Sequence, residues 1–255
     1  MAMKKEKSVS VVLPVYNEAE IIAEVVRGYY DEIIRKYPNS EFIIAEDGSD
    51  DGTKEILTEL SKEIPMRLVM GPERKGYLRG VRDALLLAKN EIVFFSDSDG
   101  QHDPRDFWKL LKKIENYDLV CGMRVKRHDP LSRKILTRFY NRLIWFYFGI
   151  YMMDTNCGFK MMRKNAVDEV VRHIKHIKFG FSTELIIRIY VNGYKISAVP
   201  ISHIKREHGV ATQFTFGRIP RVMYKQISGL RALKKELKPI IKAKGKTYKI
   251  NINKV

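Results

Sequence analysis

The sequence predicts an α/β protein in which a mostly parallel sheet lies between two layers of helices. Short runs of β-branched and aromatic residues alternate with longer segments whose apolar residues recur at helical spacing. Strands that alternate with helices are joined by crossover connections, which makes neighbouring strands parallel. With 255 residues, 45% of them hydrophobic, the chain can bury a substantial core in one large domain.

Five strands and four helices are expected in order along the first half of the chain. The clearest strand is Ile-Val-Phe-Phe at residues 92–95, because it is short, β-branched and aromatic. The clearest helix places the apolar residues Ile21, Val25 and Tyr29 on one face. The expected strands are residues 8–15, 42–45, 66–70, 92–96 and 119–121, and the expected helices are residues 18–36, 79–89, 107–114 and a segment beginning at Asp51.

Cysteine content and hydropathy exclude several classes of protein. The two cysteines, Cys121 and Cys157, are too few for a disulfide framework or a zinc cluster, and they fit a reducing compartment. The charged N-terminus lacks the apolar core of a signal peptide. The longest aromatic and apolar run, residues 143–153, is too short to cross a bilayer as a helix.

The net charge of +17 is concentrated near the C-terminus. Residues 201–255 contain 14 Lys and Arg against two Glu. Such a region suits an anionic membrane surface or a nucleic acid. A Lys-rich face that only improves solubility is the alternative.

An acidic stretch follows the strand at residues 92–96. Asp97, Asp99 and the amide of Gln101 form a set of oxygen ligands that suits Mg²⁺ or Mn²⁺ rather than zinc, and Gly100 permits a sharp turn between them. An isolated Asp-x-Asp is more often an acidic turn that caps the next helix, here with Pro104 in its first turn.

Other polar side chains stand where further strands end. Glu18 and Asp47 can accept hydrogen bonds from a base or ribose, and Arg124 can neutralise phosphate. The glycine-rich, basic link at residues 71–76 is not a Walker loop but can approach a pyrophosphate. Because the carboxyl ends of parallel strands meet at one edge of a sheet, these groups can converge on one ligand.

Three motifs carry a resemblance to a known family. They are Val-Val-Leu-Pro-Val-Tyr-Asn-Glu at 11–18, Glu-Asp-Gly-Ser-Asp-Asp-Gly-Thr at 46–53 and Asp-Ser-Asp-Gly-Gln-His-Asp-Pro at 97–104. Together they resemble family 2 glycosyltransferases of the GT-A (Rossmann-like) fold. Gly-Met-Arg at 122–124, and further motifs at 154–160, 181–185 and 193–196, resemble the dolichyl-phosphate mannose synthase and polyprenyl-phosphate glycosyltransferase branch.

The resemblance implies a role for each matching residue. Asp97, Asp99 and Gln101 would hold the divalent metal, and Asp99, Gln101 and Arg124 would form the catalytic group. The nucleotide-sugar site would comprise Pro14, Tyr16, Glu18, Asp47, Asp97, Asp99 and Arg124. An acceptor phosphate is already an anionic nucleophile, so no strong general base is expected. The histidines are interpreted as surface or supporting residues, with His102 excepted by its position.

The second half of the chain fits a lipid acceptor. Residues 133–153 begin with basic residues and continue with aromatic ones, as in a helix at a membrane interface; a buried core helix is the alternative. Arg133 and Arg138 are candidates for the acceptor phosphate. Arg-Glu-His-Gly at 206–209 resembles the family's Arg-x-x-Gly turn, which implies that Arg206 would contact the same phosphate. Residues 211–212 are Ala-Thr where the resembled family usually has Ser-Lys.

The basic C-terminal region reads as an amphipathic helix on a membrane surface, ended by Pro239 and followed by a disordered tail at residues 242–255. The expected organisation is a catalytic domain at residues 1–217 and a membrane-associating tail at residues 218–255.

These observations lead to one principal functional hypothesis. The chain would move mannose or glucose, from GDP-mannose or UDP-glucose, to a dolichyl or polyprenyl phosphate, with inversion and with Mg²⁺ or Mn²⁺. It would act as a peripheral protein on the cytoplasmic face of the membrane. A glycan or polysaccharide acceptor is the second hypothesis. A basic nucleic-acid-binding or scaffold module is the third, and nucleic acid is not expected because the carboxylates would repel its backbone.

Overall fold

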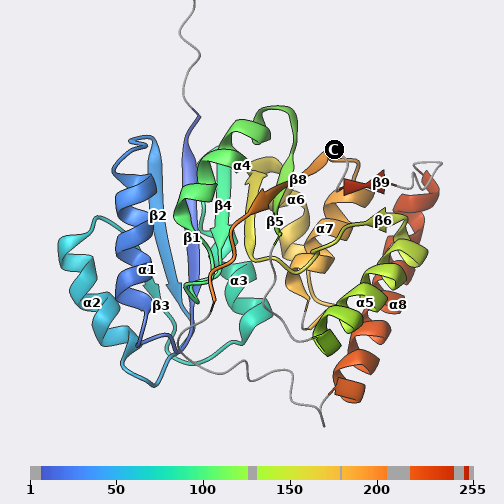
Figure 1. Cartoon of the computed structure of the whole chain (residues 1–255), viewed down its shortest axis with the longest axis horizontal. Coiled ribbons are helices and arrows are strands. Elements are labelled where there is room, and N and C mark those ends of the chain that lie inside the picture. The colour runs from blue at the N-terminus through green and yellow to red at the C-terminus, as the bar shows by residue number, and fades with distance from the viewer. Residues whose placement is uncertain (1–6, 126–130, 179, 206–218, 244–249, 253–255) are drawn as a thin grey trace, which may run out of the picture.

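The computed structural model describes residues 7–125, 131–178, 180–205, 219–243 and 250–252. At its centre lies a seven-stranded sheet with the order β3-β2-β1-β4-β7-β5-β8 (Figure 1). Helices cover both faces of this sheet, so the predicted three-layer α/β architecture is confirmed. The strands are β1 (Val9–Val15), β2 (Ser40–Glu46), β3 (Arg67–Met70), β4 (Ile92–Ser96), β5 (Leu119–Arg124), β7 (Phe159–Arg163) and β8 (Ile196–Ile201).

Two hydrophobic clusters fill the space between the sheet and its helices. The first helical layer packs on one face and contains α1 (Ile22–Tyr29), α2 (Thr53–Glu63) and α4 (Phe107–Lys113). The second layer packs on the other face and contains α3 (Tyr77–Leu86), α5 (Leu131–Phe148), α6 (Lys164–Val170), α7 (Phe181–Val191) and α8 (Ile219–Ala243).

Strand β7 departs from the parallel pattern. It lies between β4 and β5 and is antiparallel to both, whereas the other described pairs in the sheet are parallel. The chain therefore enters β7 at the edge where β4 and β5 end. Residues 154–158, which precede β7, reach the same edge as the predicted site. The sequence prediction did not place this strand, although Phe159, Met161 and Met162 supply a buried apolar run.

The first helix starts later than expected because the chain turns sharply after β1. Asn17, just before the expected helix, has a left-handed φ of 51°, and Ile21 within it has a non-helical φ of −130°. The backbone N–H of Asn17 donates to Ser49 Oγ at 3.0 Å and its side-chain amide donates to Asp50 at 2.7 Å. These bonds join the end of β1 to the turn after β2, and α1 begins only at Ile22.

Helix α5 has two apolar faces with different surroundings. Tyr140, Ile144 and Phe148 are buried in the core. Phe139 and Phe146 on the outer surface are 51% and 76% exposed. One face of the helix is therefore part of the core, and contact of the exposed face with a membrane interface stays a prediction.

The prediction that Pro239 ends the C-terminal helix is wrong, since α8 continues through it to Ala243. Pro239 has no backbone N–H, so the carbonyl of Lys235 loses its helical hydrogen bond. Because Lys235 and Pro239 are both exposed, this carbonyl can bond water. Leu230, Leu233 and Leu237 of α8 are buried in the same cluster as α5 and α7. This apolar face is thus used for packing and is not free to enter a membrane, contrary to the expectation for the tail.

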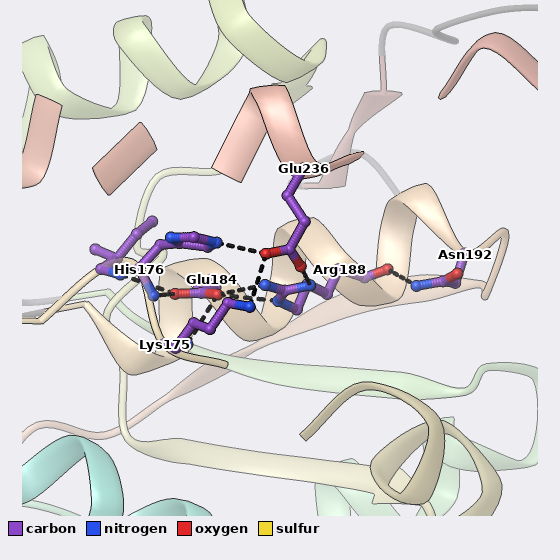
Figure 2. Close-up of polar contacts among 7 residues, drawn as sticks. Lys175, His176, Glu184, Arg188, Asn192 and Glu236 are labelled. Carbon is purple, nitrogen blue, oxygen red and sulfur yellow. Dashed lines mark hydrogen bonds and ion pairs between the residues drawn. The ribbon is translucent and has the colours of Figure 1, made fainter. Parts of the chain in front are cut away.

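A polar network attaches α8 to the rest of the protein (Figure 2). Glu236 accepts hydrogen bonds from His176 at 2.6 Å and from Arg188 at 2.9 Å, and pairs with Lys175 at 3.2 Å. Arg188 also binds the fully buried Glu184 at 2.8 Å. Burial alone would raise the pKa of Glu236, but these hydrogen bonds and charges outweigh it and lower the pKa to about 2.

The expectation of a disordered tail also needs correction for part of that segment. Ile250–Asn251 form strand β9, which pairs in parallel with β6 (Ile150–Tyr151) just after α5, and Ile252 is fully buried. Within the residues described, no helix has the length and apolarity needed to cross a bilayer.

Candidate active site

The predicted polar strand ends do meet at one edge of the sheet. Strands β1, β2, β4 and β5 run in the same direction, so their carboxyl ends all lie at the lower edge in Figure 1. Ser98 Oγ donates to the carbonyl of Pro14 at 2.8 Å, which ties the acidic turn after β4 to the end of β1. The turn itself requires Gly100, which has a φ of 70°.

Asp97 is held from two sides. Its backbone N–H donates to the carbonyl of Gly158 at 2.9 Å, and the Tyr77 hydroxyl donates to its carboxylate at 3.2 Å. Burial, with the neighbouring Asp99 carboxylate adding to it, raises the pKa of Asp97 to about 6. Asp99 Oδ1 accepts the backbone N–H of Gln101 at 3.2 Å.

These residues fit a divalent cation. Two carboxylates repel each other in a partly buried setting, and a bound cation relieves that repulsion. In the described part of the chain, no three His, Cys, Asp or Glu side chains gather to hold a metal alone. Asp97 and Asp99 would therefore be completed by the Gln101 amide and by ligand oxygens, as Mg²⁺ sites commonly are.

Arg124 reaches the edge from the end of β5. Its guanidinium donates two hydrogen bonds to Asp154, at 2.6 and 2.9 Å, and both side chains are largely buried. A bidentate pair of this kind fixes the plane of the guanidinium. The motif at residues 154–160 was recognised in the sequence, but the role of Asp154 was not predicted, since β7 had not been placed.

The proposed nucleotide residues are largely engaged with the protein itself. Asp47 accepts the backbone N–H groups of Lys75 at 3.0 Å and Gly76 at 2.9 Å, so it holds the glycine-rich link at the sheet edge. The guanidinium of Arg74 lies 3.9 Å from the centre of the Tyr16 ring. Arg74 was not named from the sequence, although the basic character of its link gave a signal.

Glu18 contributes both backbone and side chain to this edge. Its N–H donates to Thr53 Oγ1 at 3.0 Å, which connects the end of β1 to the start of α2. The carboxylate is partly exposed. The turns after β1 and β2 are thus joined to each other by hydrogen bonds.

Two buried basic groups lie behind the acidic turn. The ring of His102 lies 5.2 Å from the ring of Phe159, and its Nδ1 has no hydrogen-bond partner among the described residues. Burial, together with the nearby Arg124, lowers the pKa of His102 to about 3, so the ring is neutral. Lys160 is fully buried, donates to the carbonyl of Cys157 and places a positive charge near Asp97.

The acceptor candidates are only partly described. Arg138 is exposed on α5. The side chain of Arg133 and the whole of Arg206 lie outside the described residues. Whether these three arginines converge stays a prediction.

The three-layer α/β fold is of the GT-A type. The chain belongs to Glycosyl transferase family 2, whose sequence model matches residues 10–171. This confirms the family predicted from the three motifs.

Two curated proteins are similar along most of the chain. An uncharacterized protein of Methanocaldococcus jannaschii is 28% identical over 226 residues, covering 82% of this chain and 90% of that protein. Undecaprenyl-phosphate 4-deoxy-4-formamido-L-arabinose transferase of Salmonella choleraesuis is 27% identical over 229 residues, covering 88% of this chain and 68% of that protein.

A solved structure shares the fold. Glucosyl-3-phosphoglycerate synthase from Mycobacterium tuberculosis, in complex with Mn²⁺, UDP and phosphoglyceric acid, superposes with a TM-score of 0.66 at 18% identity. The match covers 89% of this chain and 78% of that one. At this identity the likeness concerns the fold.

Proposed function

We propose that this glycosyltransferase moves a sugar from a nucleotide-sugar donor to a polyprenyl or dolichyl phosphate. The observation that carries the proposal is that Asp97, Asp99 and the guanidinium of Arg124, which Asp154 fixes, lie at the same edge of the sheet. The similarity to the Salmonella undecaprenyl-phosphate transferase supports a lipid phosphate as acceptor. GDP-mannose and UDP-glucose are the proposed donors.

Asp97, Asp99 and Gln101 are the proposed ligands of Mg²⁺ or Mn²⁺. When bound, the cation would supply positive charge to the diphosphate of the donor and so favour its departure. The manganese complex of the Mycobacterium enzyme is consistent with such use of metal in this fold. Arg124 adds a fixed positive charge at the same edge, oriented by Asp154.

The transfer itself needs little proton chemistry. An oxygen of the acceptor phosphate forms a bond to the anomeric carbon of the sugar, while the bond from that carbon to the nucleoside diphosphate breaks, with inversion. The acceptor oxygen is already anionic, so no residue has to remove a proton from it. The neutral, buried state of His102 agrees with a supporting role for that ring.

The outer surface of α5 and α8 is the proposed membrane-facing part. Phe139 and Phe146 project from α5 next to the exposed Arg138. On α8, Arg231 donates to the Tyr147 hydroxyl at 3.5 Å and Lys234 lies 5.1 Å from the centre of its ring. Exposed aromatic side chains beside basic ones suit the interface of an anionic leaflet, here the cytoplasmic face of the membrane.

A transfer assay with matched donors tests the proposal. Radiolabelled GDP-mannose, UDP-glucose and a nucleotide-linked 4-deoxy-4-formamido-L-arabinose are each offered with a polyprenyl phosphate and Mn²⁺. We expect one donor to pass its label into the organic phase. Label that stays in the aqueous phase with every donor, from a protein that binds nucleotide, would direct the search to a glycan acceptor.

A further inference from the structure

The five residues before β7, Asp154 to Gly158, connect the donor site with the outer helix α5, and we call them the connector. Asp154, Thr155, Cys157 and Gly158 are buried although they lie outside any helix or strand. A buried loop is held only where its polar groups find partners. The partners of the connector lie on both sides of it.

On the donor side, the connector touches the two groups that the proposed reaction depends on. Asp154 binds Arg124 through two hydrogen bonds. The Gly158 carbonyl accepts the Asp97 N–H at 2.9 Å, and a Cβ added at Gly158 would lie 1.8 Å from Asp97 Oδ2. Movement of the connector therefore moves both Asp97 and Arg124.

On the other side, Asn141 of α5 bonds to the connector and to the residue before it. Asn141 is buried, donates from Nδ2 to the Met153 carbonyl at 2.9 Å and accepts from Thr155 Oγ1 at 3.2 Å. Asn141 stands on the helix that exposes Phe139 and Phe146. Its amide is thus the polar link between the proposed membrane-facing helix and the start of the connector.

The base of the connector is fixed to the core. Thr183 on α7 donates to the Asn156 side chain at 2.8 Å, and the buried Lys160 donates to the Cys157 carbonyl. Thr183 Oγ1 also lies 3.4 Å from Thr155 Oγ1. Because α7 holds these residues, a displacement of α5 acts mainly on the start of the connector, at Asp154. A packed segment with bonds on both sides transmits such a displacement rather than absorbing it.

We propose that Asn141 is a positioning residue that couples the membrane-facing helix α5 to the metal and nucleotide site through the connector. The proposal rests on the proposed function and adds to it a dependence of donor binding on the acceptor surface. By thermodynamic linkage, whatever binds α5 and changes nucleotide affinity has its own affinity changed by the same factor.

The test measures binding of Mn²⁺ with GDP or with UDP by calorimetry. Wild-type protein is titrated alone and with vesicles of phosphatidylcholine and phosphatidylglycerol that contain a polyprenyl phosphate. We expect vesicles to change the nucleotide affinity about fivefold or more. Asn141→Leu is expected to bind vesicles normally while its nucleotide affinity no longer responds to them.

A second pair of variants separates coupling from general damage to the fold. Thr155→Val removes the hydroxyl that Asn141 accepts from, and Thr155→Ser keeps it. Loss of vesicle dependence in Thr155→Val with retention in Thr155→Ser, at equal near-ultraviolet circular dichroism, supports the proposal. Equal vesicle dependence in wild type, Asn141→Leu and Thr155→Val overturns it.

The failure of this inference differs from failure of the proposed function. Wild-type protein that binds no nucleotide in the presence of Mn²⁺ contradicts the proposed function, and the inference falls with it. Wild-type protein that binds nucleotide equally with and without vesicles contradicts the inference alone.

Discussion

At the scale of single residues, the site is a balance between the Asp97 carboxylate and its surroundings. Burial and Asp99 favour its protonated form, while Lys160 and the Tyr77 hydroxyl favour the charged form. The net effect is a carboxyl group that holds its proton up to about pH 6. Below that pH, a divalent cation has to displace the proton of Asp97 before it can bind.

The raised pKa of Asp97 predicts a pH-dependent metal affinity. Below about pH 6 the carboxyl group is protonated, so the apparent affinity for Mn²⁺ should fall about tenfold for each further pH unit, and it should change little above that pH. Calorimetric titration of Mn²⁺ across this range measures the effect. An affinity that is constant below pH 6 would exclude Asp97 as a ligand that must lose a proton.

Gly158→Ala tests how Asp97 is held. The added methyl group would lie 1.8 Å from Asp97 Oδ2, so the carboxylate has to move. We expect Mn²⁺ affinity to fall by about tenfold or more, which is about 1.4 kcal/mol. Gly28→Ala is the matched control, because its new methyl group meets only Pro104 at 3.8 Å and Ala is the better helix former. Equal metal affinity in the two variants would contradict the account of Asp97.

Residue identities were easier to predict than residue partners. Asp97, Asp99 and Arg124 were named because each lies within three residues of the end of a predicted strand. Asp154, Gly158 and Lys160 received no role, because that depends on β7 lying antiparallel between β4 and β5. Such a long-range insertion leaves no local pattern beyond an apolar run.

At the scale of elements, α8 shows how tertiary packing overrides local signals. Pro239 predicts a helix end, yet Leu237 is buried and Ile240 and Ile241 pack against the core beyond it. Its basic, amphipathic pattern was consistent with a membrane helix or with a helix packed on the protein. The pattern alone does not distinguish these, because both bury one apolar face.

Glu236 gives the packing of α8 a measurable pH dependence. The pKa of this group is lower in the folded protein than its ordinary value of 4.5, so its stabilising effect is present above pH 4.5 and lost as pH falls towards about 2. We expect Glu236→Gln to lower the free energy of unfolding at neutral pH by about 1–2 kcal/mol, since the carboxylate is partly exposed. Urea unfolding at several pH values measures this.

The difference between wild type and Glu236→Gln should shrink as the pH is lowered below 4.5. Glu63→Gln is the control, because Glu63 forms an exposed pair with Arg27 and should contribute about 0.5 kcal/mol or less. A Glu236 variant that is as stable as the Glu63 variant would show that the network in Figure 2 does not secure α8.

At the scale of the whole molecule, the proposed membrane contact implies one orientation of the protein. The net charge is +17, and α5 and α8 pack against each other at one side of the protein (Figure 1). The proposed donor site lies at the carboxyl edge of the sheet, and the chain runs from α5 through β6 and the connector to that edge. With α5 and α8 on the membrane, a lipid phosphate in the membrane and a soluble nucleotide-sugar donor would both reach this edge of the sheet.

Two exposed phenylalanines test this orientation. Replacing Phe139 and Phe146 together by Ser should weaken partitioning to anionic vesicles by about tenfold or more. Each substitution removes an aromatic ring whose apolar surface would be buried in the membrane interface. Met70→Ser is the control, since Met70 is 40% exposed on the opposite edge strand β3. Vesicle sedimentation compares the variants, and equal loss in both would place the membrane contact elsewhere.

The central claim is a metal-dependent transfer of sugar to a lipid phosphate by the Asp97 and Asp99 site. The most direct measurement is single-turnover transfer of labelled sugar to polyprenyl phosphate by wild type, Asp99→Asn and the exposed α6 variant Asp168→Asn, each with Mn²⁺ or with EDTA. We expect transfer by wild type and Asp168→Asn with Mn²⁺ only, and a loss of at least about a hundredfold in Asp99→Asn. Transfer that survives EDTA, or that proceeds equally in Asp99→Asn, would contradict the central claim.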